Sequence, residues 1–226
     1  MKIFSQANHS FAVGIPTINQ ADFLNEALEK YFQDFPSTNI FILDNGNQEI
    51  KKRNKKFKII RTKENYGVAK SWNTLCDRIF KQHTHALILN DDIYLGKTES
   101  EINALISAHQ DVLIEPPFKY RWSSFILPKK YFTEQRFDEN FYPAYLEDDD
   151  YKYRLNLTGK KIINNENLSA KTYRKSQSAK SSEEEYIQNA FHKNKKYYIE
   201  KWGGLPYIKN RGPQWTGEKY KTPFNK

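Results

Sequence analysis

Short, fully apolar runs alternate along the first two thirds of the chain with longer segments whose apolar residues recur every three or four positions. The runs predict buried strands, and the recurring spacing predicts helices that pack on them. The strands expected in this way are 11–15, 40–43, 57–60, 86–89, 112–115, 124–127 and a short one at 161–163. The helices expected are 21–35, 68–80, 101–110 and one that starts at 147 and stops at Gly159.

This alternation is typical of an α/β protein with a Rossmann-like, mostly parallel sheet flanked by helices. Ligands of such sheets bind at the carboxyl ends of the strands, where the loops emerge. Three expected strands end in polar residues, namely Pro16–Thr17, Asp44–Asn45 and Asp91–Asp92, so we expect one polar crevice there. The chain has no Gly-x-Gly-x-x-Gly after the first strand and no Walker sequence, which argues against dinucleotide binding and P-loop chemistry.

The C-terminal third has a different pattern. The stretch 164–182 is polar and aperiodic, so we expect a mobile loop that is either a lid over a ligand or plain surface. Ser182 and Glu185 have capping-box spacing and predict the start of a further helix. The apolar side expected for that helix consists of Tyr186, Ile187, Ala190, Phe191, Tyr198 and Trp202.

Composition sets the class of protein. The chain has 226 residues, of which 38% are hydrophobic and 28% charged, enough to bury a core without a disulfide or a structural metal. The single cysteine, Cys76, excludes an intramolecular disulfide and a cysteine-based zinc cluster and favours a reducing compartment. No apolar stretch approaches the roughly 20 residues that span a bilayer, and the N-terminus lacks a signal-like segment. We therefore expect a cytoplasmic protein.

The positive charge is concentrated at the C-terminus. Residues 1–150 hold 19 Lys and Arg against 21 Asp and Glu, a net of −2, whereas residues 151–226 hold 17 against 6, a net of +11. Such a segment favours polyanions, phosphorylated ligands or an anionic membrane surface. Because aromatic residues are interleaved with the charges, a nucleic-acid-binding module is one alternative and a non-catalytic carbohydrate-binding protein another. Neither explains the carboxylates at the strand ends. The aromatic residues concerned are Tyr197, Tyr198, Trp202, Tyr207, Trp215 and Tyr220.

Two acidic motifs have the composition of reactive sites. The run Asn90 to Asp92 follows a buried strand, where carboxylates hold a hard divalent cation together with diphosphate oxygens; the alternative is a solvated turn. The run Glu147 to Asp150 places four acids in sequence, and repulsion with partial burial raises pKa values toward those of a general base. The alternative is a helix start stabilised by the helix dipole, with Arg154 pairing with one of its acids.

Two further segments have both a functional and a structural interpretation. Asn65 and Gly67 precede an expected helix whose N-terminus suits an anion, and Lys70 and Asn73 would then project toward a nucleotide; the alternative is an ordinary strand-to-helix turn. Trp122, with Tyr120, would form an apolar platform for an acceptor sugar or belong to the core. The first segment gains weight only from its neighbours.

Taken in order, these motifs make the chain resemble the inverting nucleotide-sugar glycosyltransferases of the family 2 type, which have the GT-A fold, and in particular their rhamnosyltransferase-like members. The resemblance covers about Phe11 to Gly159 and is looser at Lys201–Gly204. It rests on Pro16–Thr17, Asp44, Asn65-x-Gly67 with Asn73, Asn90-Asp91-Asp92, Phe137-Asp138-Glu139-Asn140-Phe141 and Glu147-Asp148-Asp149-Asp150-Tyr151-Lys152-Tyr153-Arg154.

The resemblance implies a role for each matched residue. Asp148 would be the catalytic base, with Glu147 and Asp150 positioning the acceptor or the base. Asp92 and Asp91 would hold a divalent Mn or Mg ion, and Asp91 would also contact the donor. The residues expected to bind the nucleotide sugar are Pro16, Thr17, Asp44, Asn65, Gly67, Lys70 and Asn73. Many relatives have a His after the acidic helix; this chain has none in 170–176, and Lys171, Arg174 or Lys175 would neutralise the diphosphate instead.

The resemblance also implies an organisation and partners. Residues 1–163 would be the GT-A catalytic core, with a nucleotide-binding half at about 11–92 and an acceptor half at about 93–163. Residues 164–226 would be a mobile basic loop and a helical extension of the same domain. The expected partners are a nucleoside-diphosphate-sugar donor and a glycan, lipid-linked or protein-linked acceptor, as in polysaccharide biosynthesis. Contact with an anionic membrane surface is a further expectation, and no nucleic acid is expected.

Overall fold

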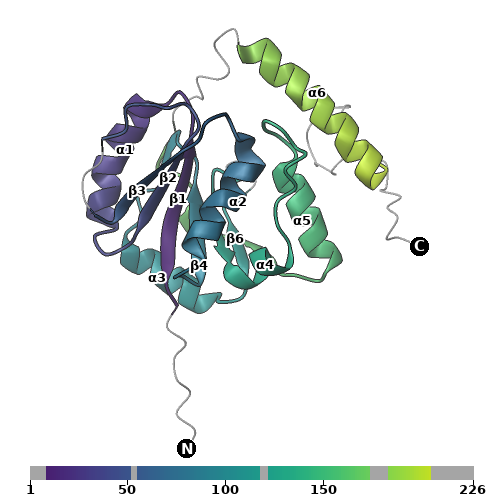
Figure 1. The fold of residues 1–226 in the computed structure, drawn as a ribbon. Coiled ribbons are helices and arrows are strands. Elements are labelled where there is room, and N and C mark those ends of the chain that lie inside the picture. The colour runs from purple at the N-terminus through teal and green to yellow at the C-terminus, as the bar shows by residue number, and fades with distance from the viewer. Residues whose placement is uncertain (1–8, 52–54, 118–121, 174–182, 205–226) are drawn as a thin grey trace, which may run out of the picture.

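Seven strands form one sheet in the order β3-β2-β1-β4-β7-β6-β8. The computed structural model describes residues 9–51, 55–117, 122–173 and 183–204 (Figure 1). Every expected strand is confirmed to within two residues. Their bounds are β1 Phe11–Thr17, β2 Ile40–Asp44, β3 Phe57–Arg61, β4 His85–Leu89, β6 Leu113–Glu115, β7 Ser124–Pro128 and β8 Ile162–Asn164.

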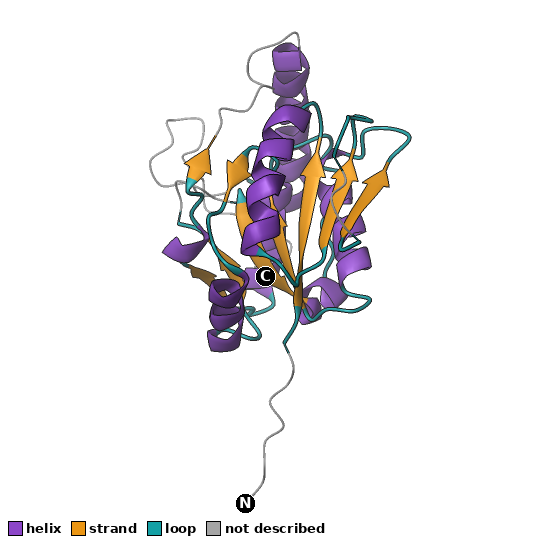
Figure 2. Ribbon diagram, turned by 90° about the vertical axis from the view of Figure 1, so that its left-hand side faces the viewer, coloured by secondary structure: helices purple, strands orange, loops and turns teal. Residues whose placement is uncertain are grey.

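The sheet is mostly parallel, as expected. Strands β3, β2, β1 and β4 pair in parallel, and so do β6 and β8, whereas β7 is antiparallel to both of its neighbours. The parallel strands therefore end at one edge (Figure 2). Strand β1 continues through Pro16 because its pairing with β4 stops at Gly14, so the missing proline N–H breaks no ladder bond on that side.

Helices cover both faces of the sheet (Figure 1). On one face α1 (Ala21–Asp34) and α3 (Glu99–Ala108) pack on alternate strand residues such as Val13, and on the other α2 (Gly67–Ile79), α4 (Lys129–Glu134) and α5 (Glu147–Leu157) pack on the intervening ones, such as Ala12. Helix α4 was not expected. Helix α3 begins two residues early, because Thr98 and Glu101 form a capping box.

The polar stretch after β8 differs from the expected irregular loop. Residues 164–173 contain a 3-10 turn, η2 (Glu166–Leu168), and a strand, β9 (Thr172–Tyr173), which pairs with β5 (Ile93–Tyr94). Leu168 is fully buried in the core, and its carbonyl accepts a hydrogen bond from the Ser124 hydroxyl. The stretch therefore contains short regular elements at η2 and β9, where the sequence predicts an irregular loop. Residues 174–182 lie outside the described ranges.

Helix α6 (Glu183–Trp202) lies outside the layers, beside α5 (Figure 1). Tyr198 and Trp202 are buried against Phe141 and Leu146, so these two aromatic rings are not available to stack on a nucleic acid. Tyr186, expected on the apolar side, is instead half exposed. The side chain of Ile187 and the predicted cap Ser182 are outside the described residues. Within the described ranges, the helices are too short or too polar to cross a bilayer.

Candidate active site

Asp91, just after β4, links the ends of β4 and β1 through hydrogen bonds. The Asp91 carboxylate accepts hydrogen bonds from the Ile18 N–H, at 3.2 Å, and from the Thr17 hydroxyl. Burial raises the pKa of Asp91 to about 7, and the neighbouring charge of Asp92 adds to this, while the two hydrogen bonds oppose it. Thr17 and Asp91 thus lie together at the carboxyl edge of the sheet, as expected.

The end of β2 joins the same cluster. Asp44 is fully buried, and its carboxylate accepts hydrogen bonds from the Gly46 and Gln48 N–H groups and pairs with Arg61. The Gln48 side chain donates both to Asp44 and to the Thr17 hydroxyl. The carboxylate predicted to contact a nucleotide base therefore already holds the 45–48 turn. Pro16 lies within β1, next to this cluster.

Asp92 has a buried oxygen that lacks a hydrogen-bond partner among the described residues, its Oδ1. The side chain is 8% exposed, and burial raises its pKa to about 6. The segment that follows is held by Tyr31 of α1, whose hydroxyl donates to the Ile93 carbonyl and accepts from the Leu95 N–H, both at 3.1 Å. Asp92 is therefore positioned by the helix layer behind the sheet.

The start of α2 is occupied by protein groups. The Gly67 N–H donates to Asn65 Oδ1 at 2.8 Å, and the Val68 N–H donates to the Pro143 carbonyl at 2.7 Å. Gly67 has a φ of +69°, and a Cβ there would lie 2.7 Å from that carbonyl oxygen. The first two N–H groups of the helix, which would otherwise be free to receive a phosphate, are thus already bonded. Lys70 lies nearer the surface, over the Tyr66 ring at 3.9 Å.

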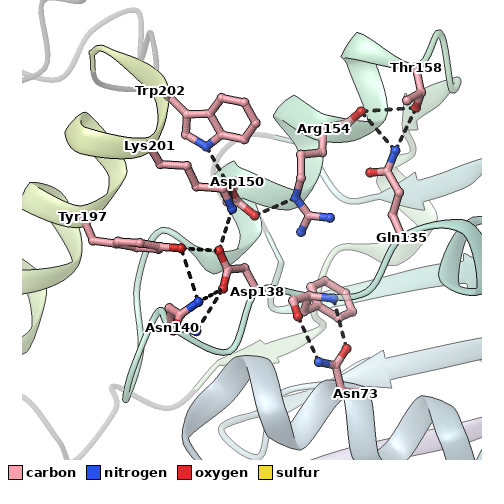
Figure 3. Close-up of polar contacts among 11 residues, drawn as sticks. Asn73, Gln135, Asp138, Asn140, Asp150, Arg154, Thr158, Tyr197, Lys201 and Trp202 are labelled. Carbon is pink, nitrogen blue, oxygen red and sulfur yellow. Dashed lines mark hydrogen bonds and ion pairs between the residues drawn. The ribbon is translucent and has the colours of Figure 1, made fainter. Parts of the chain in front are cut away.

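Two other predicted site residues face inward. The Asn73 side chain is buried and exchanges two 3.0 Å hydrogen bonds with the backbone of Phe137 (Figure 3). Trp122 is buried among aromatic rings that include Trp72 and Phe125. Trp122 therefore offers no face to an acceptor, and the core interpretation is the correct one. Tyr120 lies outside the described residues.

Helix α5 starts from a strained turn. Tyr145 and Leu146 have φ values of +80° and +73°, which cost side-chain-bearing residues energy and often mark functional sites. Glu147, the first residue of the helix, is 5% exposed, and its Oε2 lacks a hydrogen-bond partner among the described residues. Burial and the charge of Asp148 raise the pKa of Glu147 well above its ordinary value. Asp148 itself is partly exposed.

Asp150 is committed to holding α6. Its Oδ1 accepts from Trp202 Nε1 and from Lys201 Nζ, both at 2.8 Å, and its Oδ2 accepts from Arg154 Nε at 2.8 Å (Figure 3). The pairing of Arg154 with an acid is confirmed.

Burial alone would raise the pKa of Asp138, but hydrogen bonds from Lys201 and other donors hold it below the ordinary value.

The two acidic motifs lie at the same edge of the sheet. Helix α2 starts where β3 ends, and its Val68 N–H binds the Pro143 carbonyl, four residues before Glu147. On the other side of α5, the Tyr151 ring packs edge-on against the Trp122 ring, with centroids 6.2 Å apart. Trp122 lies just before β7, and β7 begins beside the end of β4. The edge that carries Asp91 and Asp92 is therefore also the edge to which α5 presents its first turn.

In sequence, the chain matches no family model and no curated protein. In structure, it is similar to a mannosyltransferase of Pyrobaculum calidifontis, solved with GDP-mannose and Mn²⁺, at a TM-score of 0.56 and 12% identity. That alignment covers 71% of this chain but only 55% of the mannosyltransferase. A Drosophila β-1,4-galactosyltransferase with manganese, UDP-galactose and xylobiose gives 0.51 and 10%, covering 76% of this chain and 74% of that one.

The chain has the GT-A fold. The fold is also similar to a cytidylyltransferase, the 4-diphosphocytidyl-2C-methyl-D-erythritol synthase of Anaerococcus prevotii. That comparison gives a TM-score of 0.50 and 9% identity over 80% of this chain and 99% of that chain. The predicted fold class is therefore confirmed.

Sequence reasoning missed three residues that position the acids of this GT-A sheet. Tyr31, which holds the segment after Asp92, has only the spacing of a core residue. Lys152 binds the buried Glu115 carboxylate at the end of β6, at 2.5 Å, and so ties α5 to the sheet. Asn194 of α6 donates to the Ala144 and Tyr145 carbonyls, at 2.8 and 3.2 Å. Of these three residues, only Lys152 lies inside a motif that the sequence analysis identified, namely the acidic motif.

Replacing Glu147→Gln is expected to stabilise this GT-A fold at neutral pH. Because the folded state raises the pKa of Glu147, it binds the proton more tightly than the unfolded state, and stability falls as pH rises above about 4.5. The variant removes this loss, so its gain in stability over the wild type should be larger at about pH 8 than at about pH 5. Urea unfolding at about pH 5 and about pH 8 measures it.

The matched control is Asp149→Asn, which removes a charge from the same helix turn at a partly exposed residue. It separates the effect of burial from that of the helix dipole. A Glu147→Gln variant that gains no more stability than Asp149→Asn between the two pH values would contradict the raised pKa.

Proposed function

We propose that the protein is an inverting glycosyltransferase that moves a sugar from a nucleoside-diphosphate sugar to an acceptor hydroxyl. The observation that carries the proposal is the placement, at one edge of a GT-A sheet, of buried carboxyl oxygens that lack hydrogen-bond partners among the described residues, namely Asp92 Oδ1, Glu147 Oε2 and, at the end of β6, Glu115 Oε2. Each buried polar atom without a partner calls for a ligand or another explanation. A donor and an acceptor bound at this edge would supply those partners.

Asp148 is the proposed base. An inverting transfer needs one group that removes the acceptor proton while the hydroxyl oxygen attacks from the side opposite the leaving diphosphate. Glu147 is buried, and burial raises its pKa, so it is less accessible to an acceptor hydroxyl than its neighbour. Asp148 is the adjacent, partly exposed carboxylate. Asp150 acts through structure, since its oxygens hold α6.

Asp92 and Asp91 are the residues that would hold a divalent Mn or Mg ion. The described residues contain no group of three or more His, Cys, Asp or Glu side chains placed to bind a metal, but such ions are commonly held by one or two carboxylates together with substrate phosphates. The unpartnered Oδ1 of Asp92 fits that arrangement. The bound ion would neutralise charge on the diphosphate leaving group.

The donor would lie along the ends of β1, β2 and β4. Thr17 and Asp44, with Pro16 beside them, form its nucleotide side, and Asn65, Gly67 and Lys70 flank it. Asn73 is better assigned to holding Phe137. Arg174 and Lys175 stay predicted partners of the diphosphate and lie outside the described residues; Tyr173, which precedes them, pairs with Ile93, which follows Asp92.

Asp92→Asn is the direct test of the donor site. We expect at least a tenfold loss of affinity for the nucleotide sugar in the presence of Mn, because the isosteric amide keeps the packing and removes the charge. Wild-type protein is first screened by thermal shift with UDP-, GDP-, dTDP- and CMP-sugars with and without Mn, since a ligand at 100 times its Kd stabilises the fold by about 2.7 kcal/mol. Calorimetry with the best donor then compares the variants.

The control is Asp77→Asn, at an exposed ion pair with Arg136, which should bind the donor like the wild type. Unchanged affinity in Asp92→Asn would place the metal elsewhere. A wild-type protein that none of the nucleotide sugars stabilises, with or without Mn, would remove the proposed function itself.

Nucleotidyl transfer is a second candidate, favoured by one observation. The similarity to the cytidylyltransferase covers 99% of that chain, whereas the mannosyltransferase is covered over 55% of its length. The two reactions differ in their products, because glycosyl transfer releases a nucleoside diphosphate and nucleotidyl transfer releases pyrophosphate. An assay that detects each product separately distinguishes them.

A further inference from the structure

Three tyrosines are exposed where the strained turn before α5 meets α6. Tyr142 is 38% exposed, Tyr145 46% and Tyr186 50%. They make up half of the six large hydrophobic side chains exposed on the described residues. Exposed aromatic residues that gather in one place indicate a binding surface, whereas scattered ones do not. We call these three residues the tyrosine patch.

Each tyrosine of the patch contacts a neighbouring segment of the fold. The Tyr142 side chain is hydrogen-bonded to that of Tyr186, and its ring lies against the start of α2, where Cδ2 would be 2.9 Å from a Cβ at Gly67. The Tyr145 ring packs edge-on against Phe191 of α6, with centroids 5.7 Å apart. The hydrogen bond from the Asn194 side chain of α6 to the Tyr145 carbonyl supports the turn. The patch is therefore built on supported elements.

The patch adjoins the proposed base. Tyr145 precedes Glu147 by two residues and Asp148 by three, in the left-handed turn that leads into α5. A general base must lie within hydrogen-bond reach of the proton it removes. A molecule resting on the patch is thus next to Asp148, where the acceptor hydroxyl must be.

The chemistry of the patch selects its ligand. Tyrosine offers an apolar ring face and a hydroxyl at low conformational cost, which matches a sugar ring with C–H groups on its face and hydroxyls on its edge. The first turn of α5 carries Asp148 and Asp149, both partly exposed, so a phosphate-rich ligand would meet like charge there. A neutral polyol would instead find carboxyl groups for its hydroxyls.

On the basis of the proposed function, we infer that Tyr142, Tyr145 and Tyr186 form an acceptor subsite that binds a neutral carbohydrate by stacking its sugar ring. This replaces Trp122, which is buried, as the aromatic platform for the acceptor. Tyr145, nearest the acidic turn, carries the largest share of binding, and Tyr142 and Tyr186 extend the surface toward α2 and α6.

The test is binding of the labelled full-length protein to an array of neutral oligosaccharides, with Mn and the best nucleoside diphosphate present. Wild-type protein should bind at least one glycan. Tyr145→Ala should weaken that binding about tenfold or more, as for a central aromatic contact, whereas Tyr145→Phe should stay within about threefold because it keeps the ring. Tyr142→Ala should show a smaller loss in the same direction.

Leu157→Ala is the matched control, because it shortens an equally exposed apolar side chain at the far end of α5; it should bind like the wild type. Should Tyr145→Ala not fold, Tyr145→Leu preserves the contact with Phe191 and removes only the flat ring. Retained binding in the alanine or leucine variants overturns the inference, as does a wild-type protein that binds no glycan.

Calorimetry with nucleotide sugar and Mn on the same samples separates the two proposals. Donor binding without any glycan binding ends the acceptor subsite and leaves the proposed function standing. Tyrosine-dependent glycan binding without donor binding supports the carbohydrate subsite and contradicts the proposed function. If the array is blank and the wild type instead sediments with vesicles of phosphatidylcholine and phosphatidylglycerol in a Tyr145-dependent way, the patch is a membrane contact and the inference fails.

Discussion

Replacing Asp150→Ala is expected to lower the free energy of unfolding by about 3–5 kcal/mol, as for loss of one partner from a buried ion pair. The carboxylate is fully buried and accepts from Lys201, Arg154 and Trp202. Removing it leaves the Arg154 guanidinium and the Trp202 indole N–H without this acceptor, and leaves Lys201 with Asp138 alone (Figure 3). Urea unfolding followed by circular dichroism measures the loss.

The loss should be uneven along the chain. Helix α6 is joined to the rest through the Asp150 and Asp138 contacts, the hydrogen bonds of Asn194 and the small cluster that includes Phe141 and Leu146. Hydrogen exchange should therefore rise most in α6 and least in the central strands, because regions with few buried contacts open first. Asp150→Asn should lose less, since its amide oxygen still accepts from an N–H.

Asp77→Ala is the matched control. Its ion pair with Arg136 has two 2.7 Å contacts, but both side chains are about half exposed. Exposed pairs contribute roughly 0–1 kcal/mol, so this variant should remain close to the wild type. An Asp150→Ala variant as stable as Asp77→Ala would show that the Asp150 contacts are not needed to hold α6.

The sheet and most helices follow from local pattern. Each continuous apolar run, such as the one ending at Leu89, could only be a strand covered on both faces, and the apolar spacing of α1 and α2 places their buried sides without knowledge of partners. Burial of Phe23, Leu24, Leu28 and Tyr31 on α1 matches that spacing. Strand order and the antiparallel β7 depend on contacts distant in sequence, and the pattern does not contain them.

The site was predictable only in part for the same reason. Carboxyl-edge placement brought Thr17, Asp44 and Asp91 together as expected. Which of their oxygens stay unpartnered depends on distant donors, as with Gln48 reaching Thr17. Asn73 has the residue type of a ligand contact, yet Phe137, 64 positions away, takes its amide. The left-handed turn at Tyr145, which exposes its ring, could not be predicted because the sequence has no glycine there.

Asp148→Asn is expected to reduce transfer by about 10²–10⁴-fold while leaving donor affinity within about twofold, because a positioned base contributes that much to the reaction rate and little to ground-state binding. The amide keeps the shape of the carboxylate and cannot accept the acceptor proton. Release of nucleoside diphosphate from the best donor, with the best array glycan as acceptor, gives the rate. Calorimetry with Mn gives the donor affinity.

Asp149→Asn distinguishes a base from a general acidic surface. It makes the same chemical change one residue along the helix, about 100° around its axis, and should retain most of the activity. Glu147→Gln should fall between the two, because its amide can still donate a hydrogen bond. If Asp148→Asn retained turnover while Asp149→Asn lost it, the base would be the neighbouring acid, and the acceptor would approach α5 from a different side than the tyrosine patch requires.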